Sequence, residues 1–90
     1  MVVARHYVVT GRVQGVGFRL FAEHVALREN LSGYVRNLAD GRVEAQAEGD
    51  AEAVERFEMA IRQGPGGAWV RDVEVTDVVP SLRATGFLVR

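Results

Sequence analysis

The chain has 90 residues and a mass of 9.9 kDa, which is enough for one small domain and too little for two domains and a linker. Hydrophobic residues make up 48% of the sequence and charged residues 26%, a composition that excludes a disordered tail or a collagen-like fibre. The net charge of −1 gives no positive field of the kind that holds nucleic acid or an anionic membrane. We therefore expect residues 1–90 to form a single domain that binds a small ligand.

The sequence contains no signal peptide and no membrane span that we can identify, because Arg5 and His6 interrupt the N-terminal apolar stretch. Cysteine is absent, so neither a disulfide nor a thiolate metal site supports the fold. We expect a cytoplasmic protein that acts as a monomer, without contact to a membrane or to nucleic acid.

The first third of the chain predicts a strand, a glycine-rich loop and a helix. Residues 2–10 are rich in valine and predict a strand, which the glycines at positions 11, 15 and 17 end. From Phe18 to Glu29 the apolar residues recur at helical spacing, and Asn30 closes the segment. The loop therefore opens directly into the N-terminus of a helix.

A β-hairpin follows. Residues 34–38 predict a second strand, and Ala39-Asp40-Gly41 predicts a tight turn. Residues 42–48 then alternate strictly, with the small and apolar side chains on one face. This alternation indicates a hairpin with one buried side.

The last part of the chain predicts a second helix and two further strands. Asp50 is suited to cap the helix, and Gly64 and Pro65 end it. Its apolar stripe consists of Val54, Phe57 and Ile61. Two ion pairs at i,i+4 spacing are expected on its exposed face, namely Glu52 with Arg56 and Glu58 with Arg62. Residues 70–79 and 86–90 predict the strands, the second of them short and at an edge.

This order of elements predicts an α+β fold, the ferredoxin-like βαββαβ sandwich, with an antiparallel sheet, two helices on one face and a short C-terminal edge strand. A right-handed crossover makes the first two strands parallel, and the third strand fills the gap between them. Parallel strands joined by a crossover end at the same edge of the sheet. Residues 14–19 should therefore face Asn37 at the end of the second strand.

The sequence Gly11-Arg12-Val13-Gln14-Gly15-Val16-Gly17-Phe18-Arg19 predicts an anion site. Unpaired backbone N–H groups and the helix dipole favour an anion at a helix N-terminus, and the guanidinium of Arg19 matches the geometry of phosphate. The segment is neither a Walker A loop, because the chain has no lysine, nor a complete dinucleotide fingerprint. Spacing alone leaves open the alternative that the glycines only turn the chain and that Arg19 is a solvated surface residue.

The other polar residues allow fewer conclusions. Asn37 fits either a turn residue that bonds its own backbone or a neutral amide that holds a water molecule beside the anion site. His6 and His24 lie away from the loop, so structural or solvated roles are expected, and Asp40 fits the hairpin turn. Phe18, Phe21 and Phe57 are expected in the core, whereas Trp69 and Tyr34 each fit either the core or the rim.

Two segments resemble the signatures of a known family. The first signature of the acylphosphatases is similar to Val9-x-Gly11-x-Val13-Gln14-Gly15-Val16-x-Phe18-Arg19. The second is similar to Gly33-Tyr34-Val35-Arg36-Asn37, followed by Gly41-x-Val43 and Gly49. The resemblance implies hydrolysis of carboxyl-phosphate mixed anhydrides, or acyl phosphates, to a carboxylate and inorganic phosphate.

The resemblance also implies the roles of the site residues. Arg19 would bind the phosphoryl group, Asn37 would orient the attacking water, and the backbone of Gln14, Gly15, Val16, Gly17, Phe18 and Arg19 would hold the phosphate. A carboxylate leaves without a general acid, because its conjugate acid has a pKa of about 4. We expect neither a metal nor a cofactor, since the sequence offers no histidine pair at ligand spacing and no aspartate-rich loop.

Two other functions are compatible with the element order. One is a ferredoxin-like module that binds an anion or a small ligand without catalysis. The other is an RNA-recognition domain, which shares the βαββαβ order but places aromatic residues on its central strands. Here the corresponding strand reads Val43-Glu44-Ala45-Gln46, so its open face offers no stacking ring, and nucleic-acid binding is disfavoured.

Overall fold

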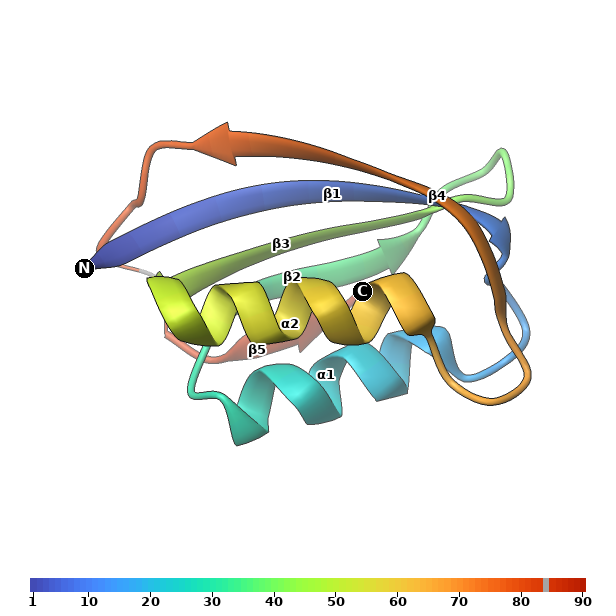
Figure 1. Cartoon of the computed structure of the whole chain (residues 1–90), viewed down its shortest axis with the longest axis horizontal. Helices are drawn as coiled ribbons and strands as arrows, with labels where there is room; N and C mark the ends of the chain where they lie inside the picture. Colours follow the sequence, from blue (N-terminus) through green and yellow to red (C-terminus); the bar gives the residue numbers. More distant parts are fainter. Residues whose placement is uncertain (84) are drawn as a thin grey trace.

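The computed structural model describes residues 1–83 and 85–90. Its elements follow the predicted order (Figure 1). They are β1 (Val2–Arg12), α1 (Phe18–Arg28), β2 (Ser32–Asn37), β3 (Val43–Asp50), α2 (Ala51–Gln63), β4 (Trp69–Val78) and β5 (Phe87–Val89). Their bounds differ from the predicted ones by one or two residues.

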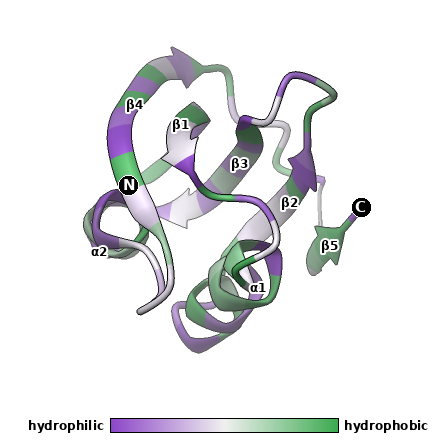
Figure 2. Cartoon of the chain, turned by 90° about the vertical axis from the view of Figure 1, so that its right-hand side faces the viewer, coloured by the Kyte–Doolittle hydropathy of each residue, from purple (hydrophilic) through white to green (hydrophobic). Residues whose placement is uncertain are grey.

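The strands form a single sheet in the order β4-β1-β3-β2-β5, and both helices cover the same face of it (Figures 1 and 2). β3 lies between β1 and β2 and runs antiparallel to both, so β1 and β2 are parallel as expected. The ferredoxin-like fold is confirmed. One detail differs: β5 pairs with β2 in the parallel direction, because the chain reverses between β4 and β5, and the sheet is therefore mixed.

The core fills the space between the sheet and the helices. Phe57 of α2 lies at its centre, with its ring centroid 5.7 Å from that of Tyr7 on β1 and 5.9 Å from that of Phe87 on β5. Phe18 and Phe57 are buried and Phe21 packs partly buried against them, so all three belong to the core as expected. The other large buried side chains include Val9, Val13, Val35, Val43, Val54 and Ile61. This core fixes the start of α1 against the sheet.

β1 continues past Gly11, which was expected to end it. The pairing between β1 and β4 shifts between Thr10 and Gly11, and Gly11 has a φ of 138°. A Cβ atom at Gly11 would lie 2.1 Å from the main-chain oxygen of Trp69, so only glycine lets the backbone of β4 approach so closely. The loop that precedes α1 consequently begins at Val13.

The helix caps agree with the sequence, but one ion pair does not. Asp50 caps α2 by accepting a hydrogen bond from the backbone N–H of Glu52, and Glu58 pairs with Arg62 at 3.1 Å. The expected pair of Glu52 with Arg56 is wrong, because Arg56 instead donates to Glu29 at 2.9 Å. Glu29 lies at the end of α1, so packing of the two helices offers Arg56 a partner that the i,i+4 rule does not consider.

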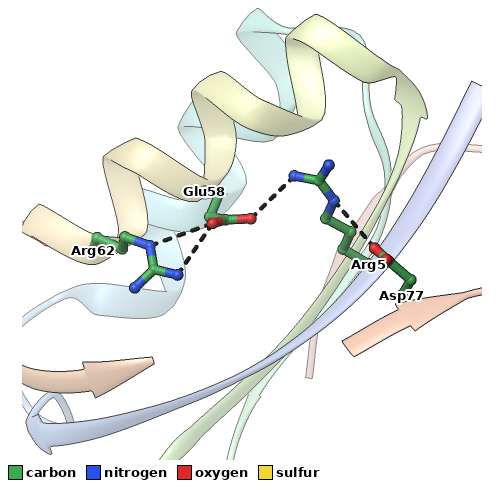
Figure 3. Close-up of polar contacts among 4 residues, drawn as sticks. All are labelled: Arg5, Glu58, Arg62 and Asp77. Carbon is green, nitrogen blue, oxygen red and sulfur yellow. Dashed lines mark hydrogen bonds and ion pairs between the residues drawn. The ribbon is translucent and has the colours of Figure 1, made fainter. Parts of the chain in front are cut away.

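A polar network ties the edge strand β4 and the helix α2 to β1 (Figure 3). The Nη1 atom of Arg5 lies 3.1 Å from Glu58, and its Nε atom lies 3.4 Å from Asp77. Nearby, burial raises the pKa of the Tyr7 hydroxyl well above its usual value, with the negative charge of Glu58 adding to the effect. Tyr7 therefore stays protonated and contributes to the core as a neutral ring.

Glu48 anchors the connection between β4 and β5. It lies on the face of β3 turned away from the helices, is only 9% exposed, and accepts hydrogen bonds from the backbone N–H groups of Ser81 at 2.9 Å and Leu82 at 2.8 Å. The bond from Ser81 is the main cause that lowers the pKa of Glu48 below its usual value, and partial desolvation opposes it. The carboxylate thus fixes the segment that brings β5 to β2.

We expect Glu48→Gln to cost about 1 to 2 kcal/mol of unfolding free energy at pH 7, because an amide oxygen is a weaker acceptor than a carboxylate. A group whose pKa is lowered by folding stabilises the native state above its unfolded pKa, and this contribution disappears as pH falls through the folded pKa. The difference in unfolding free energy between the variant and the wild type should therefore be smaller at pH 3 than at pH 7. Urea unfolding at both pH values measures it, and an equal cost at both would exclude the charged form as the cause.

Candidate active site

The loop between β1 and α1 leaves the N-terminus of α1 open. Gly15 and Gly17 have φ values of 73° and 79°, in the left-handed region, and Gly17 caps the helix without a side chain. Among residues 1–83 and 85–90, apart from each glycine and its two chain neighbours, no heavy atom lies within 4 Å of the position of a Cβ at either glycine. The first turn of α1 contains no acidic residue, so the positive end of the helix dipole is unopposed there.

A pocket of about 140 Å³ lies at this helix N-terminus. Its lining consists of Val13, Gly15, Gly17, Phe18, Arg19, Leu20 and Asn37. The structure thus brings Arg19 and Asn37 together although 18 positions separate them in the chain. The reason is topological: α1 connects the parallel strands β1 and β2, so the start of the helix and the end of β2 meet at one edge of the sheet.

Two residues of the expected phosphate loop do not line this pocket, namely Gln14 and Val16. The side chain of Gln14 points to the hairpin and donates to the main-chain oxygens of Leu38 at 2.7 Å and Arg42 at 2.9 Å. Gln14 therefore holds the loop against the end of β2. The sequence motif placed Gln14 at the site but could not indicate the direction of its side chain.

Arg19 is the second residue of α1 and is exposed. Its Nη1 atom donates a hydrogen bond to the main-chain oxygen of Arg90 at 2.8 Å. Within residues 1–83 and 85–90 no other hydrogen bond or ion pair of the Arg19 side chain is present. A guanidinium carries five N–H donors, so most of them are available to an anion in the pocket.

Asn37 is the last residue of β2, paired with Val43 of β3, and is half buried. Its amide forms no hydrogen bond with any residue that the structure describes. Asp40, and not Asn37, stabilises the hairpin turn, because its carboxylate accepts a hydrogen bond from the backbone N–H of Arg42 at 3.1 Å. This bond lowers the pKa of Asp40. The structure thus leaves the amide of Asn37 free to bind a ligand or a water molecule in the pocket.

The remaining candidates lie elsewhere. His6 sits on the face of the sheet opposite the helices, with its Nε2 atom 2.7 Å from Glu44, and His24 is exposed on α1. Trp69 is 61% exposed and pairs with Arg12 where β1 ends, so it belongs to the surface and not to the core. Among residues 1–83 and 85–90 no three histidine, aspartate or glutamate side chains are placed to hold a metal ion. No helix of the described chain is long and apolar enough to cross a membrane.

The geometry is that of a small anion site. Backbone N–H groups at a helix N-terminus and the guanidinium of Arg19 supply positive charge, while Asn37 adds a neutral donor and acceptor to the lining. Leu20, Val13 and Phe18 add apolar surface to the lining. Such a pocket suits a phosphoryl group that is attached to an organic remainder.

A protein-family model described as Acylphosphatase matches residues 5–89. The chain belongs to the acylphosphatase family. It is 46% identical over 85 residues to an acylphosphatase of Koribacter versatilis, covering 94% of this chain and 77% of that protein. It is 58% identical over 67 residues to an acylphosphatase of Thermus thermophilus, covering 74% and 76%. The expected family, and with it the class of hydrolases that act on acyl phosphates, is therefore confirmed.

A solved structure agrees with the fold as well. The crystal structure of an acylphosphatase from Bacillus subtilis superposes with a TM-score of 0.94 at 38% identity, covering 100% of this chain and 99% of that one. The acylphosphatase architecture thus extends over the whole chain, including the short strand β5 and the adjoining Arg90 that contacts Arg19. That contact was not predicted, although the strand expected at residues 86–90 already indicated that the last residues lie at an edge of the sheet.

Proposed function

We propose that the pocket formed by the 13–17 loop, Arg19 and Asn37 hydrolyses the carboxyl-phosphate bond of acyl phosphates, releasing a carboxylate and inorganic phosphate. The observation that supports this proposal is that Arg19 and Asn37 line one pocket at an open helix N-terminus. The Arg19 guanidinium and the backbone N–H groups of the loop bind the phosphoryl oxygens. Because they are held in place before the reaction, they stabilise the charge of the transition state without reorganising.

Asn37 positions the nucleophile in this proposal. Its amide oxygen accepts a hydrogen bond from a water molecule, whose oxygen then attacks phosphorus in line with the departing acyl oxygen. The bond between water oxygen and phosphorus forms as the bond between phosphorus and acyl oxygen breaks, and the bonding pair leaves with the carboxylate. A phosphoryl oxygen of the substrate accepts the proton of the water, so no basic side chain is required.

This reaction requires little from the protein beyond positioning and charge. The leaving carboxylate is the conjugate base of an acid with a pKa of about 4, so it departs without a proton donor. The loose transition state of phosphoryl transfer spreads negative charge over the oxygens that Arg19 and the loop contact. We therefore propose that turnover is independent of metal ions.

The proposed reaction uses residues of one chain and requires no residue of a second copy, so we propose a monomeric enzyme. We propose that residues 1–90 act as one domain in the cytoplasm and take only the acyl phosphate as substrate. Size-exclusion chromatography with light scattering tests the monomer, and fractionation of cells that express the protein tests the location.

The direct test is turnover of benzoyl phosphate, with and without EDTA, combined with inhibition by inorganic phosphate. We expect hydrolysis that EDTA does not change, and competitive inhibition by phosphate because the product has the charge and shape of the transferred group. Backbone N–H signals of residues 14–19 should shift in NMR spectra as phosphate is added. Phosphate binding without any turnover would instead favour the non-catalytic binding module.

The acyl group should contact Leu20. This side chain lines the pocket beside Arg19 and is 67% exposed, so it offers apolar surface at the rim of a site for a charged group. We expect Leu20→Ala to lower kcat/KM for benzoyl phosphate by about 5- to 10-fold, since about 1 to 1.4 kcal/mol of apolar contact is lost. Acetyl phosphate, whose smaller acyl group offers less apolar surface to Leu20, should be affected less. Equal losses for both substrates would contradict this role.

A further inference from the structure

Arg90 is fixed by its main chain on two sides. Its backbone N–H donates to the main-chain oxygen of Val35 on β2 at 2.9 Å, and its own main-chain oxygen accepts the hydrogen bond from Arg19 at 2.8 Å. Arg90 follows directly after β5, so it links the edge of the sheet to the side chain proposed to bind the phosphoryl group. The position of Arg90 therefore affects the position of the Arg19 guanidinium.

The side chain of Arg90 has one contact that explains where it lies. Its guanidinium carbon is 4.3 Å from the centroid of the Tyr34 ring, which is the geometry of a cation–π interaction. No carboxylate of residues 1–83 and 85–90 lies within ion-pair distance of Arg90. Beside this contact is a groove of about 250 Å³, lined in part by Tyr34, Leu88 and Arg90.

The ring of Tyr34 provides a rigid surface on which the guanidinium of Arg90 packs. It lies in the middle of β2 and pairs with Leu88 of β5, and its half-buried ring is on the face of the sheet opposite Asn37 and the helices. Burial raises the pKa of the Tyr34 hydroxyl, and the neighbouring Glu44 raises it further, so the ring stays neutral and keeps the electron density that attracts a cation. Tyr34 does not line the pocket of Arg19 and Asn37.

We propose that Tyr34 is a positioning residue of the phosphoryl site: its ring holds the Arg90 side chain, and the main-chain oxygen of Arg90 in turn holds the Arg19 guanidinium. The inference rests on the proposed role of Arg19. β5 has three residues and pairs with β2 alone, and such short edge strands open easily. The cation–π contact keeps the end of this strand closed, so that the flexible side chain of Arg19 is oriented before the substrate arrives.

The inference is tested with the variants Tyr34→Leu and Arg90→Met and with the double variant. Arg90→Met removes the guanidinium but keeps the main-chain oxygen. We expect each single variant to lower kcat/KM for benzoyl phosphate by about 2- to 5-fold and to weaken competitive inhibition by phosphate similarly, which corresponds to a cation–π contact of about 0.5 to 1 kcal/mol. Because both variants break the same contact, the double variant should be no worse than either single one.

Two controls separate positioning from general stability. Tyr34→Phe keeps the ring, so this variant, unlike Tyr34→Leu, should have the wild-type kcat/KM and the wild-type inhibition by phosphate. Arg62→Met removes a cation that pairs with Glu58 on α2 and does not line the pocket, and it should change neither. Effects of Tyr34→Leu and Arg90→Met that simply multiply, or a lower melting temperature with unchanged kinetic constants, would overturn the inference.

The same experiments distinguish this inference from the proposed function. In an Arg19→Gln background, Tyr34→Leu should cause no further loss of phosphate inhibition, because the residue through which it acts is gone. If Arg19→Gln alone leaves activity intact, the proposed site is wrong. If Arg19→Gln is inactive while Tyr34→Leu matches the wild type, only the positioning role of Tyr34 fails.

Discussion

We expect the replacement of Arg19 by glutamine to abolish nearly all turnover of benzoyl phosphate and to leave the protein folded. Arg19 is the one cationic side chain among the described residues that lines the pocket. In the proposed reaction its guanidinium contacts the phosphoryl group, which gains charge in the transition state. Loss of one such donor costs on the order of 10² to 10³ in kcat. Arg19 is exposed on α1 and glutamine is a good helix former, so the fold should not change.

Arg28→Gln is the matched control, because it removes an exposed arginine from the last turn of the same helix. It should keep the wild-type rate. Arg19→Lys should also be poor, since an ammonium is a point charge and cannot replace the planar fork of donors that fits phosphate. The kinetic constants of all three variants, measured on protein with native circular dichroism, decide the matter. Wild-type kcat in a folded Arg19→Gln protein would remove the loop from consideration as the active site.

Most of the fold could be predicted because its signals are local. Alternation of apolar residues, the glycines after Thr10, the cap at Asp50 and the break at Gly64 each act over a few residues, and the structure has all of these elements in the predicted order. The meeting of Arg19 and Asn37 also followed from the sequence, because the handedness of the β1-α1-β2 crossover leaves one arrangement. Chain topology thus brought together residues that no local pattern connects.

The features that could not be predicted depend on contacts between elements distant in sequence. Arg56 donates to Glu29, which lies at the end of the other helix, because α1 and α2 pack against each other. The i,i+4 rule considers only partners within one helix and therefore predicts Glu52. Gly11 continues β1 because the backbone of β4 at Trp69 needs the space. The contact of Arg19 with Arg90 depends on the direction of β5, which a three-residue strand does not encode by itself.

Asn37→Ala should separate binding from catalysis. If Asn37 orients the water while Arg19 and the loop hold the phosphoryl group, kcat falls by at least about 10²-fold and the inhibition constant of phosphate stays within a few-fold of wild type. β2 should still form, because Asn37 is its last residue and its backbone pairing with Val43 does not depend on the side chain. Arg36→Ala, which changes the neighbouring residue on the opposite face of the strand, is the control and should keep the wild-type kcat.

Each possible result for Asn37→Ala assigns the residue a different role. Equal losses in kcat and in phosphate affinity would make Asn37 a direct ligand of the phosphoryl group, and the water would then need another partner. An unchanged kcat would return Asn37 to a purely structural role, although Asp40 already provides the turn. We expect a folded, phosphate-binding and inactive protein, because Arg19 and the backbone N–H groups of the loop are donors only and cannot accept the hydrogen bond of the attacking water.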